Sequence, residues 1–368
     1  MEMRRFSYFL FENFDPEEQA QNPQNPRRFL NASVDPILDR IAQEPPRNCP
    51  ADAFSAGAVV PLLQGGILRE EDGCLLFDTP VLLREDAPVL RKEMRARAER
   101  LTEELLPAVP QLQACCQELD NGFPAEINLY HILCGMVFDG LFFDYLSRQN
   151  AVATSRLHDS GLDYLTVIYE NCQELNEFSD GLLCSYNCFT DGICSLQSFG
   201  DCDGSRLDVY RVSRLLETGQ LPPRLERAGR LLEAYPGKEY LLAQVRQLVE
   251  KGTCEPEAMA LLTEFGYAAD GRLCVPVYTG AALQAAERIE KILEERIGGS
   301  FVQALSGVEG LTAVCHGVPE KELANEMYHI LFGSVNEALA ARGIVASPPK
   351  IPGEGRYLRC IQLETEKE

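Results

Sequence analysis

The densest group of side chains that could do chemistry is a set of cysteines near the middle of the chain. Cys184, Cys188, Cys194 and Cys202 lie within nineteen residues. Thiolates bind zinc and iron–sulfur clusters, so this density raises a thiol-metal site. No two of the four have the CxxC spacing usual for zinc, and no histidine lies among them. The spacing therefore favours reduced thiols buried as small apolar side chains, with metal binding as the weaker alternative.

Two of the four histidines recur in one motif. Tyr130-His131-Ile132-Leu133 is repeated as Tyr328-His329-Ile330-Leu331, and each copy has a glycine four positions after its histidine, Gly135 and Gly333. An imidazole can act as a general base or a metal ligand. Each of these histidines, however, precedes two apolar residues of a helix face and has no nucleophile or carboxylate placed beside it. We therefore expect hydrogen-bonded core histidines in helices that pack the two copies together. The residues expected in this contact are Tyr130, His131, Gly135, Tyr328, His329 and Gly333.

A third group consists of arginines with helical spacing in the later part of the chain. Residues 206–251 hold nine basic and six acidic residues. The arginines in question are Arg211, Arg214, Arg224, Arg227 and Arg230. Arginines on one helix face can grip DNA phosphates, which makes these residues candidates for DNA binding. The favoured alternative is a solvated face on which they pair with Asp208, Glu217, Glu226 and Glu233.

Global charge and the absence of catalytic motifs narrow the classes of function. The chain carries 34 basic and 56 acidic residues, a net charge of −22, which repels nucleic-acid phosphates. The GxSxG, P-loop, GxGxxG and HExxH patterns do not occur. We therefore expect no cofactor and no enzyme activity. A protein partner or self-association is expected, and DNA is possible but disfavoured.

The elements that position these groups are organised as an internal duplication. The Tyr-His-Ile-Leu motifs lie 198 residues apart, and seven of twelve aligned positions from Tyr130 and from Tyr328 are identical. An Asp-Gly pair recurs at the same offset, as Asp72-Gly73 and Asp270-Gly271. Asp-Gly between apolar alternations predicts a β-hairpin, because glycine accepts the positive φ of a tight turn. Two matches at one offset predict two copies of one folded unit.

Each copy has the same expected order of elements. Helices lead into the Asp-Gly hairpin, then come a long charged helix, the Tyr-His-Ile-Leu helix and a short strand. The long helices are expected over 89–106 and 285–297, and the closing strands over 164–168 and 357–361. This predicts an α+β, mainly helical fold. The expected parts are an N-terminal arm (1–27), repeat 1 (28–172), an acidic cysteine-bearing connector (173–205) and repeat 2 (206–368).

The run Ala258-Met-Ala-Leu-Leu-Thr-Glu-Phe-Gly-Tyr267, followed by Asp270-Gly271-Arg-Leu, resembles the winged-helix domains of bacterial regulators. The resemblance covers about half of each copy and implies two winged-helix-like units in tandem. It also implies that the helix before each hairpin would enter the DNA major groove. That helix carries no basic residue over 53–64 and three acids over 255–264, which departs from a DNA-reading pattern.

The chain is expected to be cytoplasmic and to contact no membrane. Its first apolar run, ending at Phe11, is too short for a signal-peptide core. The longest apolar stretch, 127–143, contains Asn128, His131 and Asp139 and is expected to fall short of a membrane span. In the reducing cytosol the 14 cysteines are expected to remain free or to bind metal.

Overall fold

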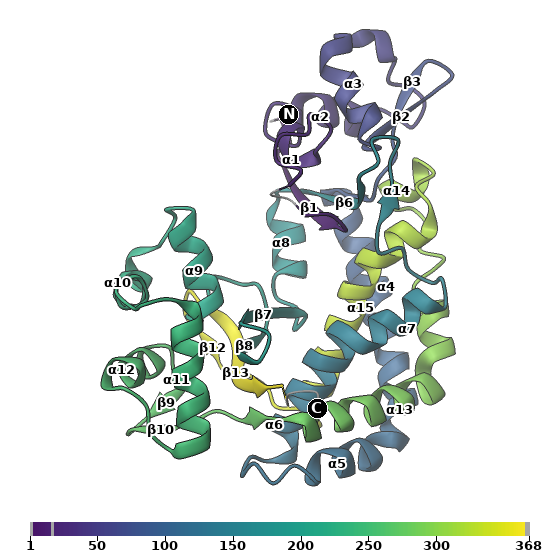
Figure 1. The fold of residues 1–368 in the computed structure, drawn as a ribbon. Helices are drawn as coiled ribbons and strands as arrows, with labels where there is room; N and C mark the ends of the chain where they lie inside the picture. The colour runs from purple at the N-terminus through teal and green to yellow at the C-terminus, as the bar shows by residue number, and fades with distance from the viewer. Residues whose placement is uncertain (1–2, 16–17, 365–368) are drawn as a thin grey trace. The chain divides into compact units, whose positions relative to one another are not determined.

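The computed structural model describes residues 3–15 and 18–364, and within them the chain is α+β (Figure 1). About 51% of it is helix and 16% strand, in several small sheets, which confirms the class expected from the sequence. The chain divides into two compact units. Unit 1 comprises Met1–Ala98, Asp144–Ser179 and Gly298–Leu331, and unit 2 comprises Glu99–Phe143, Asp180–Ile297 and Phe332–Glu368. Each unit therefore takes segments from both halves of the chain.

Unit 1 is built on a small mixed sheet around one buried strand. Strand β6 (Asp163–Glu170) pairs antiparallel with β1 (Phe6–Glu12) on one side and parallel with β4 (Val81–Leu82) on the other, and β5 (Arg156–Leu157) also pairs antiparallel with it. The run Tyr-Leu-Thr-Val-Ile-Tyr in β6 suits a strand because aromatic and β-branched side chains pack well on a pleated surface. All of its residues from Tyr164 to Glu170 are buried.

The first hairpin of unit 1 consists of β2 (Leu68–Glu71) and β3 (Cys74–Phe77). Its turn residues Asp72 and Gly73 have φ of 54° and 77°, the positive values that a two-residue hairpin turn of type I′ needs. The hairpin expected from this Asp-Gly pair is therefore present. The helices of this unit are α1 (Pro26–Phe29), α2 (Asp35–Gln43), η1 (Ala51–Ala53), α3 (Ala56–Gln64), η2 (Arg84–Asp86), α8 (Gln173–Ser179) and α14 (Thr312–Cys315).

Four further helices contribute residues to both units. They are α4 (Ala87–Leu105), α7 (Phe142–Arg148), α13 (Gly280–Ala304) and α15 (Glu320–Ala341). Helices α4 and α13 correspond to the long charged helices expected after the two hairpins. In unit 1, the guanidinium of Arg97 from α4 donates to the carbonyls of Ala304 and Ser306, at 2.9 and 2.7 Å, which ties the end of α13 to α4.

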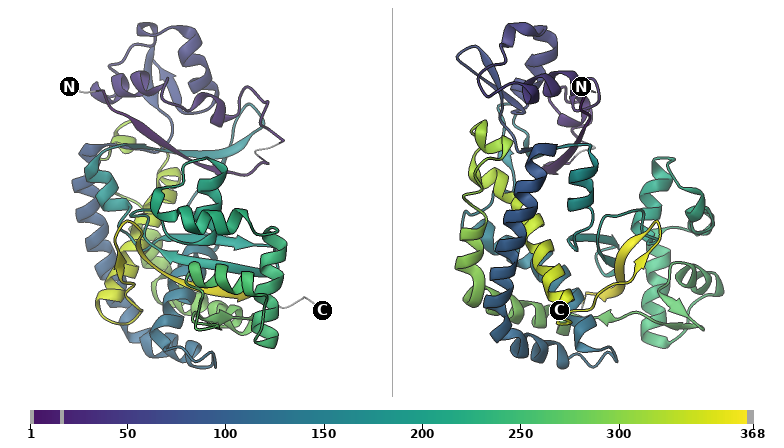
Figure 2. Two further views of the ribbon diagram at one scale, coloured as in Figure 1. Left: turned by 90° about the vertical axis from the view of Figure 1, so that its left-hand side faces the viewer. Right: turned by 180° about the vertical axis from the view of Figure 1, so that it is seen from behind.

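Unit 2 contains a larger sheet in which the strand order is β11-β13-β8-β7. Its strands are β11 (Val277–Tyr278), β13 (Gly355–Leu363), β8 (Cys194–Gly200) and β7 (Ser185–Thr190), and β12 (Lys350–Ile351) pairs with β13. Figure 2 shows the teal pair β7 and β8 beside the yellow β13. Two of these strands, β7 and β8, come from the segment expected to be a connector.

Helices and a second Asp-Gly hairpin complete unit 2. The helices are η3 (Leu106–Ala108), α5 (Val109–Gln117), α6 (Ala125–Leu129), η4 (Tyr130–Leu141), α9 (Val209–Glu217), η5 (Pro223–Leu225), α10 (Glu226–Glu233), α11 (Lys238–Lys251) and α12 (Pro256–Glu264). The hairpin joins β9 (Ala268–Ala269) to β10 (Arg272–Leu273) through Asp270 and Gly271, with φ of 50° and 73°. Val245, Leu262 and Phe265 are buried in one core with Leu196 of β8. Burial of a side chain of this size contributes about 1.5–3 kcal/mol.

The sheets of the two units share one topology and one register. Val81 of β4 lies opposite Ile168 of β6, and Val277 of β11 lies opposite Ile361 of β13. With β6 and β13 aligned in this way, β5 matches β12 and β1 matches β8, each with the same pairing direction. Phe6 then corresponds to Cys194, since these residues lie opposite Glu170 and Leu363. Strand β7 has no counterpart in the sheet that the structure describes in unit 1.

The apolar stretch around residues 127–143 forms part of one long helical run. The run covers Ala125–Arg148, 24 residues, and by length and composition it is long enough to cross a membrane, which corrects the expectation that it would fall short. The charged and polar residues that interrupt the apolar stretch do not end the helix. Of its most apolar window, 61% is buried inside the protein, as in the core helix of a soluble protein. Residues 130–141 of this run are π-helical, a form that is rare at such length.

Candidate functional site

The arginines expected to bind DNA lie on or near α9 and α10 of unit 2, and the exposed ones have acidic partners. Arg214 lies 2.7 Å from Glu217, Arg227 lies 2.9 Å from Glu264, and Arg230 lies 3.3 Å from Glu226. Their side chains are 59%, 77% and 70% exposed. Glu217 and Glu226 were expected as partners, whereas Glu264 on α12 was not. The alternative of a solvated, internally paired face therefore describes the geometry of these three residues.

The other two arginines have structural surroundings. Arg224 donates to the carbonyl oxygens of Ser205 and Gly353 and lies 3.5 Å from Glu354. It therefore holds two segments of unit 2 together rather than pointing freely to solvent. Arg211 is half-buried on α9, and its Nε atom is buried without a hydrogen-bond partner.

The four central cysteines are not gathered into a metal site. Cys194 on β8 is buried in the core, whereas Cys188 on β7 is half-buried. Cys184 precedes β7, and Cys202 is exposed. Burial raises the pKa of Cys188 above its ordinary value and that of Cys194 to about 12, so both stay as neutral thiols. Across residues 3–15 and 18–364, no three His, Cys, Asp or Glu side chains are arranged to hold a metal ion. The separation of the thiols follows from the hairpin, which sends them to different strands and depths.

The first Tyr-His-Ile-Leu motif packs against strands from later in the chain, inside unit 2. The Tyr130 hydroxyl donates to the carbonyl of Phe199 at 2.9 Å, and the His131 ring lies 5.7 Å from that of Tyr278. Gly135 faces the Phe199 ring. His131 is 3% exposed, its Nε2 is buried without a hydrogen-bond partner, and burial lowers its pKa to about 3.

The second motif divides between the two units. In unit 1, Tyr328 is buried against the Phe301 ring, and the half-buried His329 stacks on Phe11 of β1, with ring centroids 5.9 Å apart. The His329 Nδ1 lies 2.9 Å from the carbonyl oxygen of Asn325. In unit 2, a Cβ added at Gly333 would lie 3.0 Å from Cβ atoms of the segment that precedes β7, so a glycine is needed there for close approach.

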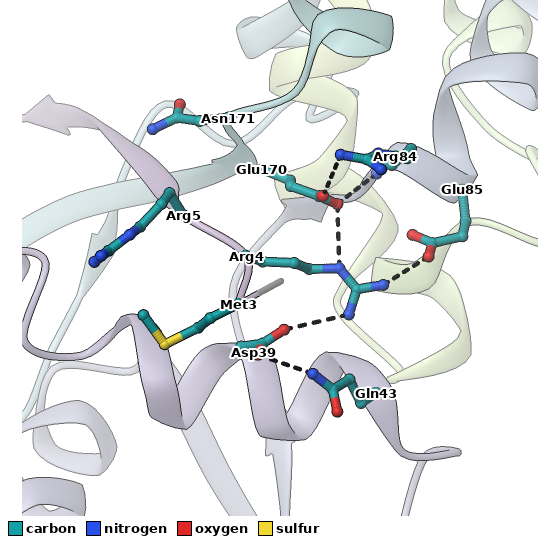
Figure 3. A pocket seen from close by; sticks show the side chains of 9 residues that line it. All are labelled: Met3, Arg4, Arg5, Asp39, Gln43, Arg84, Glu85, Glu170 and Asn171. Atoms are coloured by element: carbon teal, nitrogen blue, oxygen red, sulfur yellow. Dashed lines mark hydrogen bonds and ion pairs between the residues drawn. The ribbon is translucent and has the colours of Figure 1, made fainter. Parts of the chain in front are cut away.

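A charged pocket in unit 1 is the site that sequence reasoning missed. It has a volume of ≈ 340 Å³ and lies where β1 begins and β6 ends (Figure 3). Its lining residues are Met3, Arg4, Arg5, Asp39, Gln43, Arg84, Glu85, Glu170 and Asn171. Strand pairing brings these segments together, because Phe6 at the start of β1 lies opposite Glu170 at the end of β6.

Arg4 is the centre of the pocket's ion pairs. Its guanidinium donates to Glu85 at 2.6 Å and lies 3.3 Å from Glu170 and 3.5 Å from Asp39. Figure 3 shows Arg4 directed into this group of carboxylates and Arg5 directed away from it. The buried Glu170 also accepts the backbone N–H of Arg84 at 2.9 Å. Glu170 is therefore held between Arg4 and the start of the helical turn at Arg84.

Asp39 contributes a buried carboxylate to the pocket. Asp39 is 7% exposed, and Gln43 donates to its Oδ2 at 2.8 Å. Its Oδ1 is buried, accepts no hydrogen bond and forms a 3.5 Å ion pair with the Arg4 guanidinium. Asp39 therefore helps to hold Arg4 in place inside the pocket.

The pocket presents several charged side chains to solvent. Arg5, Arg84 and Glu85 are more than half exposed and can contact a ligand directly. The Cys172 thiol hydrogen-bonds Arg84 of the pocket, and burial raises the pKa of that thiol. The sequence signal that could have found this site is Arg4-Arg5 directly before an aromatic strand, together with Glu170 at the end of the closing strand.

Unit 2 contains an acidic residue whose pKa is raised. Asp139 lies in the π-helical stretch, and burial raises its pKa to about 8, an effect that the positive charge of Arg206 opposes. Its counterpart in the second motif, Glu337, instead forms a 2.6 Å ion pair with Arg356. The two motifs therefore share an acid at this position, but the two acids have different electrostatic surroundings.

Comparison with protein-family models, curated protein sequences and solved structures gave no match.

Proposed function

We propose that this chain is a non-catalytic, cytoplasmic binding or regulatory protein that holds a protein partner at the charged pocket of unit 1. The exposed charged side chains that line the pocket, Arg5, Arg84 and Glu85, carry this proposal. A binding site needs groups that can gain partners when the ligand arrives, and the exposed carboxylate of Glu85 can accept a further donor beside its bond to Arg4. Self-association is the other form that a protein contact can take.

The chemistry of the partner follows from charge. The chain has a net charge of −22, so a basic protein is attracted to it over long range. A lysine or arginine side chain of the partner would pair with the exposed Glu85. The volume of ≈ 340 Å³ leaves room for such a side chain beside Arg4.

A photo-cross-linking experiment in cells tests this proposal. A photoreactive residue at Gln43, on the pocket rim, is expected to cross-link to protein, and Glu85→Lys is expected to reduce the cross-link about tenfold through charge repulsion. Glu70→Lys is the matched control, because Glu70 is exposed in the same unit on β2 but does not line the pocket. Equal cross-linking in the two variants, or adducts with nucleic acid only, would contradict the proposal.

The second candidate is a DNA-binding regulator of winged-helix type acting through unit 2. The order α11, a four-residue turn from Gly252 to Glu255, α12 and the β9–β10 hairpin supports it, as do the exposed Arg227 and Arg230. Both arginines have acidic partners, so phosphate binding would have to replace Glu264 and Glu226. We therefore rank DNA below a protein partner.

DNA retention at low salt distinguishes the two candidates. Under the DNA alternative, duplex DNA is retained by the full chain and lost in Arg227→Ala/Arg230→Ala, with a steep salt dependence. Arg224 is left intact because it holds the backbone of unit 2. Retention that survives the double substitution, or no retention at about 50 mM salt, removes this alternative.

A further inference from the structure

We propose that an extended segment of the partner protein adds to unit 1 as a strand, antiparallel to β1, with its C-terminal end beside the charged pocket. This inference rests on the proposed function and assigns the surface and the binding mode. The observation behind it is that the sheet of unit 2 has one strand more, at this same edge.

The outward edge of β1 is open in the described part of the chain. Strand β1 has seven residues and is the end strand in the order β1-β6-β4. Asn171 donates to the Arg5 carbonyl at 2.7 Å, and Asn13 donates to the Asp163 carbonyl at 2.9 Å. Because antiparallel hydrogen bonds alternate along a strand, the odd-numbered residues of β1 bond β6 and the even-numbered ones point away from it.

The outward-pointing residues are Phe6, Tyr8, Leu10 and Glu12. Within residues 3–15 and 18–364, their backbone N–H and C=O groups have no hydrogen-bond partner. A row of such groups is a template for pairing with another strand.

Unit 2 shows what this position holds when it is filled. Strand β8, the counterpart of β1, also has seven residues. Asp201 donates to the Arg356 carbonyl at 2.9 Å, so the odd-numbered residues of β8 bond β13. Asp191 donates to the Cys194 carbonyl at 3.3 Å, so the even-numbered residues bond β7. The groups of β8 that bond β7 therefore match the open groups of β1 one for one.

The sequence of β7 in unit 2 indicates what kind of segment would pair with β1. Strand β7 reads Ser-Tyr-Asn-Cys-Phe-Thr, an uncharged run without proline, and it pairs antiparallel with β8 over six residues. Proline would remove a donor to the ladder. Phe9 of β1, which is 53% exposed, offers apolar area to a side chain of the added strand.

The direction of the added strand connects it to the pocket. Met3, Arg4 and Arg5, which line the pocket, directly precede β1. An antiparallel strand ends beside the first residues of β1. A lysine or arginine that follows the paired residues would therefore reach the exposed Glu85. The occupant is thus an uncharged, proline-free strand of about six residues followed by a basic residue.

Hydrogen exchange on the full chain tests this inference. The probe is a capped peptide with the sequence of residues 185–190, with Cys188→Ser to prevent oxidation, followed by a lysine. At about 1 mM, a concentration that reveals weak binding, it is expected to slow amide exchange at Phe6, Tyr8, Leu10 and Glu12 about tenfold. Amides of Ser7, Phe9 and Phe11 already bond β6 and should change little.

Two substitutions at one position provide the control. Leu10→Pro removes an outward N–H that β6 does not use, and it is expected to weaken peptide binding about tenfold, whereas Leu10→Ala keeps the N–H and binds within about threefold of the unmodified chain. Retained protection of Phe9 and Phe11 amides in Leu10→Pro shows that the β1–β6 ladder is intact.

The results separate this inference from the proposed function. No protection by the peptide, or protection unchanged in Leu10→Pro, overturns the added strand, while cross-linking that still depends on Glu85 leaves the pocket standing. Conversely, equal binding of peptides that end in lysine or alanine, together with edge protection, overturns the pocket and keeps the strand. A dimer of the free chain that Leu10→Pro dissociates would replace the partner segment by a second copy.

Discussion

At the residue scale, the two repeated histidines have diverged in environment. His131 is fully buried with one ring nitrogen unpaired, whereas His329 is half-buried and its Nδ1 lies 2.9 Å from a backbone carbonyl oxygen. Burial holds the pKa of His131 at about 3, below its unfolded value of about 6.5. The stability contribution of the neutral ring is therefore complete above pH ~6.5 and is lost as pH falls towards 3.

We expect His131→Phe to keep or raise the free energy of unfolding at pH 7, because it removes an unpaired buried polar atom while filling the space. It should also flatten the loss of stability between pH ~6.5 and ~3. His329→Phe is the matched variant and should cost about 1 kcal/mol, since it deletes a polar contact to Asn325. Urea unfolding as a function of pH measures both. An unchanged pH profile in His131→Phe would refute the assignment.

Asp139 gives a residue-scale prediction of opposite sign. Its folded pKa of about 8 lies above the ordinary value of 3.8, so the protonated form favours folding. The stability that it contributes is present below pH ~4 and is lost as pH rises to about 8. Asp139→Asn should therefore stabilise the protein at pH 8.5 by roughly 1–2 kcal/mol relative to pH 5. Thermal unfolding at both pH values measures this, with Asp144→Asn, at an exposed position of α7, as the matched control.

At the element scale, the effect of a proline in β1 depends on the direction of the N–H group that it removes. Phe9 uses its N–H to bond β6 and Leu10 does not, although both side chains are apolar. Phe9→Pro removes a bond to β6 and should cost about 3 kcal/mol or more, whereas Leu10→Pro should cost about as much as Leu10→Ala. Guanidinium unfolding of the two proline variants measures the difference. Equal losses would mean that the hydrogen-bond parity assigned to β1 is wrong.

The Asp-Gly turns are the elements that the sequence determined most directly. Asp72-Gly73 and Asp270-Gly271 specify their turns through backbone conformation alone, and both have the positive φ values that the pattern requires. By contrast, β7 and β8 lie in a segment expected to be a connector, because their polar, cysteine-rich sequence does not alternate as a half-buried strand does. Every β8 residue is buried because the strand lies between β7 and β13.

At the scale of the whole molecule, the compact units do not coincide with contiguous halves of the chain. Residues 99–143 belong to unit 2 and residues 298–331 to unit 1. We therefore expect the fragments 1–205 and 206–368 to lack cooperative unfolding when expressed separately. Mixing them should restore it, because each supplies helices that the other needs. Thermal unfolding followed by circular dichroism measures this, and independent cooperative unfolding of either fragment would contradict the unit boundaries.

By itself, the sequence determined the class of fold, both hairpins, the two long helices and the duplicated motif, since these depend on local turn chemistry and periodicity. The tertiary structure alone decided which segments share a unit and that the central thiols are separated. It also assembled the charged pocket from Arg4, Asp39, Arg84 and Glu170, which are far apart in the chain. Long-range strand pairing makes such contacts, and a local pattern such as Arg4-Arg5 before an aromatic run does not show which distant residues it meets. The open edge of β1 follows from comparison of the two sheets, because strand β7 of unit 2 has no counterpart in the sheet described for unit 1.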